Sequence, residues 1–265
     1  MNYSLNSGLW YYIVHVLNND QMLPWQLVLL TSGFALIALA AGYFLGSINS
    51  AIFISRLVYK DDIRNHGSGN AGLTNMLRTY GKSAAGLTLL GDLLKTALSV
   101  VIGCILGGFG YIGAISVGNA YCMLPLGYIA GFAAIIGHIL PIYYNFKGGK
   151  GVLCTAVMAL VLTPIEFAIL IGVFVLIVAT TKYVSLGSVT AAILYPVAVN
   201  AHMQIAFGKG SLDGMTAFIT IIIAIIIVYC HRENLKRISE GTERKLSIGG
   251  KKKKDSEASD EASEK

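Results

Sequence analysis

The stretch QLVLLTSGFALIALAAGYFLGSINSAIFISRL, residues 26–57, decides the fold. It carries no charged residue before Arg56. It is longer than the roughly 20 apolar residues that cross a hydrocarbon core about 30 Å thick. Six further apolar runs follow it, at 84–106, 127–145, 151–163, 165–181, 184–206 and 214–231. We therefore predict an all-α integral membrane protein, a polytopic bundle of about seven transmembrane helices.

The composition agrees with a membrane protein and leaves room for one domain. Hydrophobic residues make up 55% of the 265 residues, charged residues make up 13%, and the mean hydropathy is +0.65. We assign residues 26–240 to the membrane domain. Residues 1–25 are expected to form an interfacial extension rather than a cleaved signal peptide, and residues 241–265 a charged, disordered cytoplasmic tail.

The distribution of basic residues predicts the orientation in the membrane. With the N-terminus outside, 18 of the 20 Lys and Arg residues fall in the inner loops and the C-terminal tail. Lys209 lies in an outer loop and Lys95 within a predicted span. Because cytoplasmic loops carry an excess of positive charge, we predict an outside N-terminus and a cytoplasmic C-terminus. The polar motifs described next all fall on the predicted cytoplasmic side.

The first motif is the loop HGSGNAGLTNMLRTYGKS, residues 66–83. Its closing Gly-Lys-Ser is not a nucleotide-binding phosphate loop, because that motif requires glycine where Met76 stands. Glycines let successive N–H groups turn toward one anion, and an arginine can clamp a phosphate with two parallel hydrogen bonds. The alternative is an ordinary loop between helices. The candidate phosphate-binding residues here are Gly67, Ser68, Gly69, Asn70 and Arg78.

The second motif is GHILPIYYNFKGGKG, residues 137–151, in which Lys147 and Lys150 flank Gly148 and Gly149 directly before an apolar helix. A helix N-terminus presents free N–H groups, and adjoining glycines let an anion approach closely. We predict that these four residues bind phosphate. The alternative is a pair of lysines that mark the membrane boundary. His138 is expected to be buried and bonded to a neighbouring helix.

The third motif lies where the last span ends. His231 and Asn234 are three residues apart, so they share one helix face. Histidine exchanges protons near neutral pH, and asparagine can orient a hydroxyl group. The alternative is a cationic helix end with solvated polar residues.

Two smaller features complete the set of polar groups. Asp92 and Lys95 lie three residues apart inside the second span, where ionisable groups either pair structurally or face a site. Ser188 shares a helix face with Ser185 at the start of the sixth span. Serines in such helices often bond only to the backbone.

Together these segments resemble the bacterial acyl-phosphate:glycerol-3-phosphate acyltransferases, the PlsY family. The matches run in order along the chain: Gly46-Ser47-Ile48, then GSGN-x-G-x-TN-x-x-R-x-x-GK at 67–82, GH-x-x-P…FKGGKG at 137–151 and HREN-x-x-R…GTE at 231–243. The chain departs from the pattern at Asn49 for Pro, Leu73 for Ala and Thr96 for Gly. These departures bear on helix packing rather than on polar contacts.

The resemblance implies an enzyme that moves a fatty acyl group from acyl phosphate to the 1-hydroxyl of sn-glycerol 3-phosphate. The products are lysophosphatidic acid and phosphate, in phospholipid biosynthesis. It implies no metal or other cofactor, and it implies membrane lipids and the two substrates, not nucleic acid, as partners. It also implies a multi-pass protein of the inner (cytoplasmic) membrane with its active site facing the cytoplasm.

On this reading the motifs take specific roles. Acyl phosphate is already activated, so positioning and charge stabilisation supply most of the catalysis. We expect a catalytic group of His231, Asn234, Ser68 and Arg78, with Lys150 and Ser188 as further phosphate ligands. We expect the residues that contact the substrates to be held in position by a second set, which comprises Asp92, Lys95, His138 and Glu243. The proton of the glycerol hydroxyl goes either to His231 or to the donor phosphate.

The main alternative is a transporter or channel for an organic phosphate or another anion. The donor groups gather on one side of the membrane and no internal repeat is visible, whereas transport sites usually lie near the midplane between repeats. A structural scaffold would leave the three motifs unexplained.

Overall fold

The computed structural model describes residues 9, 12–13, 22–107, 115–117, 120–122, 125–207 and 214–246. The extension predicted for residues 1–25 lies outside these ranges except for 9, 12–13 and 22–25. The tail predicted for residues 241–265 lies outside them from residue 247 onward.

The described residues confirm the all-α class. The helices are α2 (Pro24–Gly46), α3 (Ser50–Val58), α4 (Leu73–Tyr80), α5 (Lys82–Gly107), α6 (Leu126–Ile139), α7 (Val152–Leu162), α8 (Pro164–Thr181), α9 (Val184–Phe207), α10 (Gly214–Cys230) and α11 (Arg232–Ser239). Short 3₁₀ turns lie at η2 (Ile63–Asn65) and η3 (Ile142–Tyr144). The described strands, β1 (Ile115–Val117) and β2 (Ala120–Cys122), form one antiparallel hairpin.

Each of the seven predicted membrane segments is helical, but they differ in length. Within the described ranges, five segments are long and apolar enough to span a membrane: Trp25–Val58, Lys82–Gly107, Leu126–Tyr144, Pro164–Thr181 and Val184–Ile205. The pair α10 and α11, bent by 53° at their junction, adds a sixth if it counts as one span. The predicted fourth segment is the short α7. The count of seven and the orientation of the termini therefore stay predictions.

The first predicted span contains two helices, because the chain breaks between Gly46 and Ser50. Asn49, which stands where the family pattern has proline, begins α3: its Oδ1 accepts a hydrogen bond from the Ile52 amide at 3.1 Å. The buried ammonium of Lys95 donates to the freed carbonyls of Gly46 and Ile48 at 3.0 and 2.9 Å. These backbone groups at the break are thus hydrogen-bonded within the protein, as groups at membrane depth must be.

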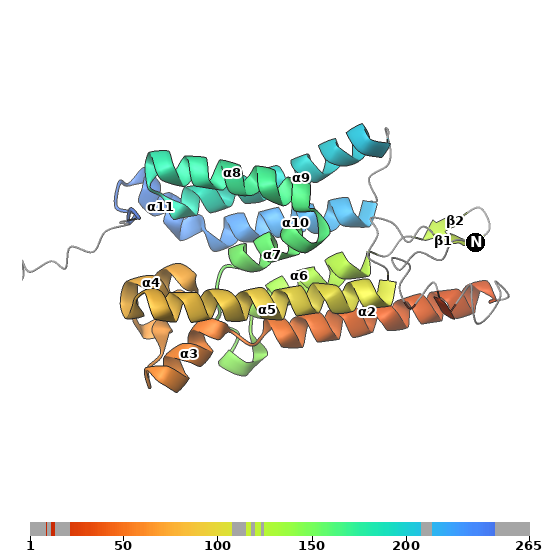
Figure 1. The fold of residues 1–265 in the computed structure, drawn as a ribbon, viewed down its shortest axis with the longest axis horizontal. Coiled ribbons are helices and arrows are strands. Elements are labelled where there is room, and N and C mark those ends of the chain that lie inside the picture. The colour runs from red at the N-terminus through yellow and green to blue at the C-terminus, as the bar shows by residue number, and fades with distance from the viewer. Residues whose placement is uncertain are drawn as a thin grey trace, which may run out of the picture.

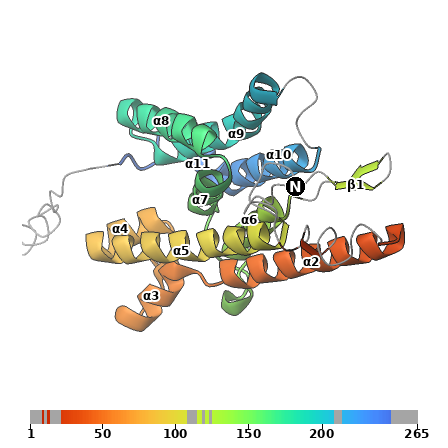
Figure 2. The ribbon, with the colours of Figure 1, turned by 45° about the vertical axis from the view of Figure 1, so that its right-hand side comes forward.

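The helices form two lobes (Figures 1 and 2). In the first lobe α2, α5 and α6 pack on one another, and in the second α9 packs on both α8 and α10. Helix α7 lies between the lobes and contacts α5, α6 and α8. Helices α3, α4 and α11 gather at one end of the molecule, opposite the β1–β2 hairpin (Figure 1). This end brings the three sequence motifs together.

Candidate active site

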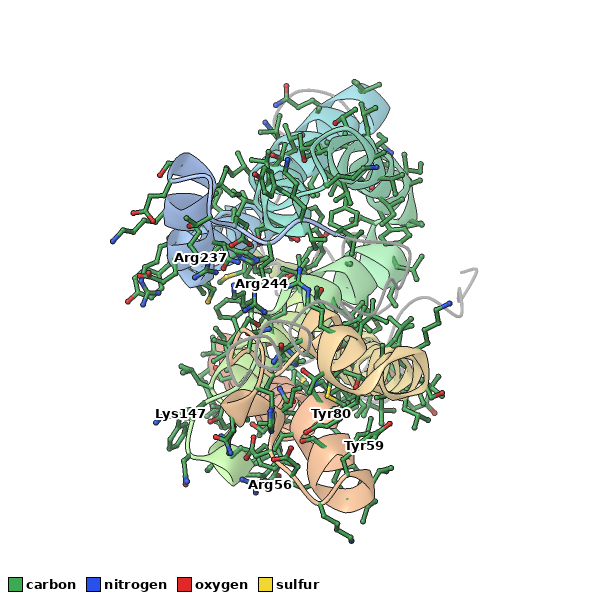
Figure 3. All side chains as sticks on the ribbon, turned by 90° about the vertical axis from the view of Figure 1, so that its left-hand side faces the viewer. Arg56, Tyr59, Tyr80, Lys147, Arg237 and Arg244 are labelled. Atoms are coloured by element: carbon green, nitrogen blue, oxygen red, sulfur yellow. The ribbon has the colours of Figure 1, made fainter. Side chains whose placement is uncertain are left out.

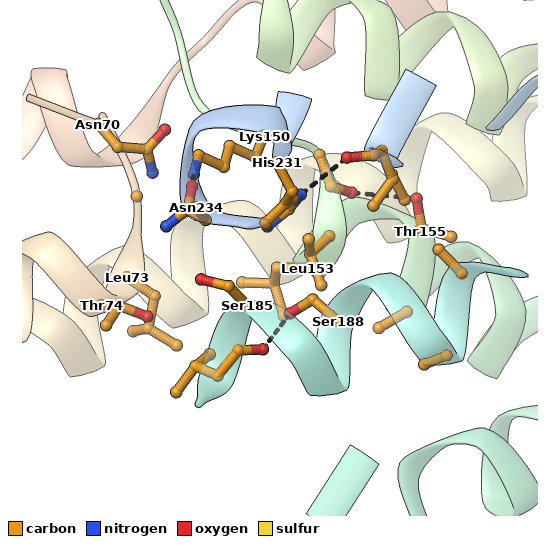
Figure 4. A pocket seen from close by; sticks show the side chains of 18 of the residues that line it. Asn70, Leu73, Thr74, Lys150, Leu153, Thr155, Ser185, Ser188, His231 and Asn234 are labelled. Atoms are coloured by element: carbon orange, nitrogen blue, oxygen red, sulfur yellow. Dashed lines mark hydrogen bonds between the residues drawn. The ribbon is translucent and has the colours of Figure 1, made fainter. Parts of the chain in front are cut away.

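A cavity of about 650 Å³ opens between the two lobes and collects residues from all three motifs. Its polar end is lined by Gly67, Ser68, Asn70, Thr74, Asn75, Arg78, Lys150, Ser185, Ser188, His231, Asn234, Arg237, Thr242, Glu243 and Arg244. Figure 4 shows Lys150, His231 and Asn234 grouped on one side, with Ser185 and Ser188 of α9 facing them. Arg78 and Lys150, which lie far apart in sequence, share this one cavity, as the sequence predicted.

The other end of the cavity is an apolar arm between α7, α8 and α9. We use that name for the part lined by Ala156, Ala159, Phe167, Leu170, Ile171, Phe174, Ala191, Ala192 and Tyr195. Alanines on α7 and α9 leave the space, while larger side chains of α8 form the opposite wall. A continuous cavity with a polar end and an apolar arm suits a ligand with a charged head and a hydrocarbon tail.

The glycine-rich loop is folded around the side-chain amide of Asn75. The Asn75 Nδ2 donates to the carbonyls of Ile63 (3.2 Å) and His66 (2.9 Å), and its Oδ1 accepts from the Ser68 amide (3.0 Å). Gly67 and Gly69 adopt positive φ angles of 59° and 71°, which glycine tolerates best. Of the residues predicted to bind phosphate in this loop, Gly67, Ser68 and Asn70 line the cavity, whereas Gly69 does not.

The Gly148-Gly149 turn differs from the prediction. Neither glycine lines the cavity, and their amides donate to the carbonyls of Ile139 (3.1 Å) and His138 (3.0 Å) at the end of α6, so they are not free for phosphate. A side chain at Gly148 would meet the His138 carbonyl, and one at Gly149 the His138 ring. The glycines are therefore present because the turn packs directly against α6.

The two lysines of this motif also separate. Lys150 lines the cavity, but Lys147 does not. Figure 3 shows Lys147 well apart from Arg237 and Arg244. The Lys147 carbonyl instead accepts from the Arg64 guanidinium at 3.2 Å, as does the Tyr144 carbonyl at 2.9 Å. Arg64 is itself held by Asp62, so it ties the glycine-rich loop to the 141–151 segment.

Asn234 connects Lys150 to Glu243. The Lys150 ammonium donates to Asn234 Oδ1, and Asn234 Nδ2 donates to Glu243 Oε1 at 2.7 Å. Glu243 also accepts from Ser185 Oγ and from Arg237 Nε, both at 2.8 Å. An ammonium can only donate and a carboxylate can only accept, so these two partners fix which way the amide points.

The charges of this group alter its proton affinities. Burial lowers the pKa of Lys150 below its ordinary 10.5; the charge of Glu243 opposes this change and that of Arg237 adds to it. Burial acts to raise the pKa of Glu243, but hydrogen bonds from Asn234, Arg237 and Ser185 outweigh it and hold that pKa below 4.5. Glu243 is therefore ionised at neutral pH, beside two cations.

His231 is buried at the junction of α10 and α11, with its Nδ1 2.8 Å from the Ile227 carbonyl. A carbonyl can only accept, so Nδ1 carries the proton and Nε2 of the neutral ring is an acceptor. The ring lines the cavity. The Ser188 hydroxyl, also at the cavity, donates to the Val184 carbonyl at 2.9 Å.

Asp92, Lys95 and His138 form a buried cluster behind the polar end. Lys95 Nζ lies 2.9 Å from Asp92 Oδ1 and 3.0 Å from His138 Nδ1. Asp92 and His138 line the cavity, while Lys95 does not. The carbonyl of His138 also holds the Gly149 amide, so the cluster supports the turn that carries Lys150.

Sequence reasoning missed two arginines and the apolar arm. Arg237 follows Asn234 by three residues in the third motif. This spacing places both residues on one helix face, and it is the feature of the sequence that could have identified Arg237 as a site residue. Arg244 lies beyond α11 in the segment assigned to the tail, and it reaches the cavity only because residues 241–246 fold back. Alanines in an apolar helix give no sign that they line a cavity.

Fold and cavity define a class: a polytopic membrane protein with a pocket that is lined by cationic and polar residues and continues into an apolar arm. Comparisons with known proteins identify the family. The family model of glycerol-3-phosphate acyltransferase matches residues 36–241. Curated relatives of that description are 39% identical in Finegoldia magna (77% of this chain, 92% of the relative) and 40% identical in Syntrophomonas wolfei (77% and 93%). The chain belongs to the glycerol-3-phosphate acyltransferase family.

Solved structures agree with this assignment. A crystal structure of PlsY (YgiH), an integral membrane glycerol 3-phosphate acyltransferase in its glycerol 3-phosphate form, matches with a TM-score of 0.67 and 30% identity. The match covers 80% of this chain and 96% of that one. The lysophosphatidic acid form of the same protein matches with a TM-score of 0.64 and 29% identity.

Proposed function

We propose that the protein transfers a fatty acyl group from acyl phosphate to the 1-hydroxyl of sn-glycerol 3-phosphate and releases lysophosphatidic acid and phosphate. One observation supports this most directly: a single cavity joins a cation-rich polar end to an apolar arm. Both substrates carry phosphate and one carries a hydrocarbon tail. The arm suits the acyl chain, and the polar end suits the two anions.

The chemistry asks little of the protein beyond placement. The hydroxyl oxygen of glycerol 3-phosphate attacks the acyl carbonyl carbon, a new ester C–O bond forms, and the C–O bond to phosphate breaks. The phosphate leaves with the bonding electron pair. Ser68, Arg78, Lys150 and Ser188 surround the polar end and are assigned to bind the phosphates. Holding the reactants together and stabilising developing charge then lower the barrier.

The proton of the hydroxyl has two acceptors within this proposal. His231 presents an unprotonated Nε2, because its Nδ1–H is donated to Ile227. A phosphate oxygen of the donor is the other acceptor. Asn234, held by Lys150 and Glu243, is assigned to orient the glycerol hydroxyl beside His231.

The proposed setting is the inner (cytoplasmic) membrane of a bacterium, with the polar end of the cavity toward the cytoplasm. The concentration of Lys and Arg in the predicted inner loops supports this orientation. The residues of the polar end lie with α4 and α11 at one end of the molecule (Figure 1). Glycerol 3-phosphate, which is water-soluble, would enter there.

The test uses the full chain in lipid vesicles with radiolabelled glycerol 3-phosphate. With acyl phosphate present, label should enter chloroform-extractable lipid; with acyl-CoA in its place, it should not. Equal transfer from acyl-CoA would contradict the proposed donor. Label that accumulates in the lumen as free glycerol 3-phosphate, with none in lipid, would indicate the transporter instead.

A further inference from the structure

Two guanidinium groups at the cavity, Arg78 and Arg244, form no ion pair with any residue that the structure describes. Both residues line the cavity. Neither makes a hydrogen bond or an ion pair with any residue in the described ranges. Arginine carries five N–H donors and stays charged, so a pair of such groups in one pocket leaves many donors for a ligand.

The other cations of the cavity are already engaged. The Arg237 Nε donates to Glu243 at 2.8 Å, and the Lys150 ammonium donates to Asn234. The carboxylates that line the cavity are likewise engaged, because Glu243 holds Arg237 and Asp92 holds Lys95. Within the described part of the cavity, Arg78 and Arg244 are the cations that make neither a hydrogen bond nor an ion pair with another residue.

Arg244 is held at the cavity by the segment on either side of it. Before it, Glu243 accepts from Ser185 and Asn234, at 2.8 and 2.7 Å. After it, the Leu246 amide donates to the Lys182 carbonyl at 2.8 Å. The segment 241–246 therefore crosses from α11 to the start of α9. Arg237 and Arg244, both labelled in Figure 3, line the cavity between the two lobes.

Arg78 and Arg244 carry like charges and line the same cavity. The pKa of Arg78 is lowered, first by the partial burial of its guanidinium and then by the charge of Arg244, while Glu243 acts in the opposite direction. Two like charges in one pocket disfavour each other until an anion lies between them. A phosphomonoester, which carries about two negative charges, can accept hydrogen bonds from both guanidinium groups.

The position of the pair indicates which substrate it binds. The acyl chain of the donor needs the apolar arm between α7, α8 and α9, which brings the donor phosphate toward Ser188 of α9 and Lys150 beside the start of α7. Arg78 and Arg244 are exposed, so they lie where the cavity meets water. A water-soluble phosphomonoester reaches this position first.

We propose that Arg244, together with Arg78, binds the phosphate of glycerol 3-phosphate, in a subsite separate from that of the donor phosphate. This inference rests on the proposed function for the identity of the ligand. It assigns a substrate-binding role to Arg244, which is not among the site residues predicted from the sequence. The segment 241–246 thus contributes directly to the acceptor site.

The first test compares Arg244→Ala with Lys245→Ala, the neighbouring cation. Lys245 lies over the Tyr183 ring, 5.6 Å from its centroid, and does not line the cavity. In Arg244→Ala the KM for glycerol 3-phosphate should rise by roughly 10- to 100-fold, because a charge-assisted contact is lost. Its kcat at saturating acceptor and its KM for acyl phosphate should stay within about twofold of wild type. Lys245→Ala should match wild type, and Arg244→Lys should recover part of the loss.

A second measurement needs no turnover. Calorimetric titration of the detergent-purified protein with glycerol 3-phosphate alone should show the same weakening in Arg244→Ala and not in Lys245→Ala. An unchanged affinity and KM for glycerol 3-phosphate would overturn the inference. So would a rise confined to the KM for acyl phosphate, which would place Arg244 at the donor. If wild-type protein binds glycerol 3-phosphate through Arg244 but transfers no acyl group, the proposed function fails and the subsite stands.

Discussion

Asn234 has a carbonyl oxygen and an amide nitrogen that are both engaged, one with Lys150 and the other with Glu243. The three residues come from the 146–151 turn, from α11 and from the 241–246 segment. Each side chain therefore fixes the next before substrate arrives. A preorganised polar group of this kind stabilises charge in a transition state without first having to reorient.

The two lysines that flank the glycine pair should respond differently to truncation. Lys150→Ala should cost about 2–5 kcal/mol of transition-state stabilisation, a loss of at least roughly 30-fold in kcat/KM, because it removes the half-buried ammonium proposed to bind phosphate. Lys147 lies on the other side of the two glycines and does not line the cavity, so the kcat/KM of Lys147→Ala should stay close to that of the wild type. Steady-state kinetics of both variants, each shown to be folded in detergent, make the comparison. Equal losses would mean that Lys150 has no special contact with substrate.

The lowered pKa of Lys150 also predicts a pH dependence. Its protonated form binds phosphate, so kcat/KM should fall as pH rises through the pKa of Lys150, which lies below the ordinary 10.5. In Lys150→Arg the group keeps its charge at higher pH. The alkaline limb of the kcat/KM profile should therefore move to higher pH in Lys150→Arg. Superimposable limbs in the two proteins would assign the titration to another group.

Helices α2 and α6 approach closely because small residues face each other across their interface. Gly42 and Gly46 are one turn apart on α2, and they lie against Ala130 and Ala134 of α6. A Cβ at Gly46 would come within 2.6 Å of the Ala134 Cα. Small residues at one-turn spacing let membrane helices pack through their backbones, where van der Waals contacts hold them together.

This interface predicts a position-dependent effect of adding one methyl group. Gly46→Ala should lower the free energy of unfolding by about 1–3 kcal/mol, because the α6 backbone blocks the new atom. Gly33→Ala, in the same helix with no atom within 4 Å of the built Cβ, should be neutral or slightly stabilising. Thermal unfolding in detergent measures both. A Gly46→Ala protein as stable as Gly33→Ala would show that the helices can move apart at little cost.

At the scale of the molecule, the cavity lies between two lobes rather than within either one. The glycine-rich loop leads into α4, which is followed in the chain by α5 of the first lobe. The second lobe contributes α9, α10 and the segment 241–246. Helix α7 contributes alanines to the apolar arm from its position between them. The placement of α7 against α8 and α9 of the second lobe therefore sets the width of the arm.

Filling the arm should penalise long acyl chains selectively. Ala192→Leu places a larger side chain at a buried position that lines the arm. The kcat/KM for a long-chain acyl phosphate should fall by at least roughly tenfold, because a few extra methylenes are excluded, while a short-chain donor should be affected less. Ala201→Leu, exposed on the same helix, is the matched control. Equal losses for long and short donors would indicate that the chain lies elsewhere.

The sequence was sufficient for the helices and for most of the predicted site residues that share the cavity, but not for their contacts. Apolar runs reveal helices because each must satisfy its backbone in lipid. Three ordered motifs predicted that Arg78, Lys150 and His231 meet. The turn at Gly148 and Gly149 was misread, because a glycine needed for close packing looks the same in sequence as one needed for an anion. Arg244 was missed because only the fold-back of residues 241–246 brings it to the cavity.

The continuity of the cavity from its polar end into the apolar arm has a consequence for how turnover ends. In the proposed reaction the hydrocarbon tail belongs to the donor before transfer and to the product after it, so the tail keeps its place while the head group is exchanged. The spent inorganic ion departs into water past the exposed arginines. The new single-chain lipid keeps its tail among α7, α8 and α9, so its release is a step separate from that of the ion.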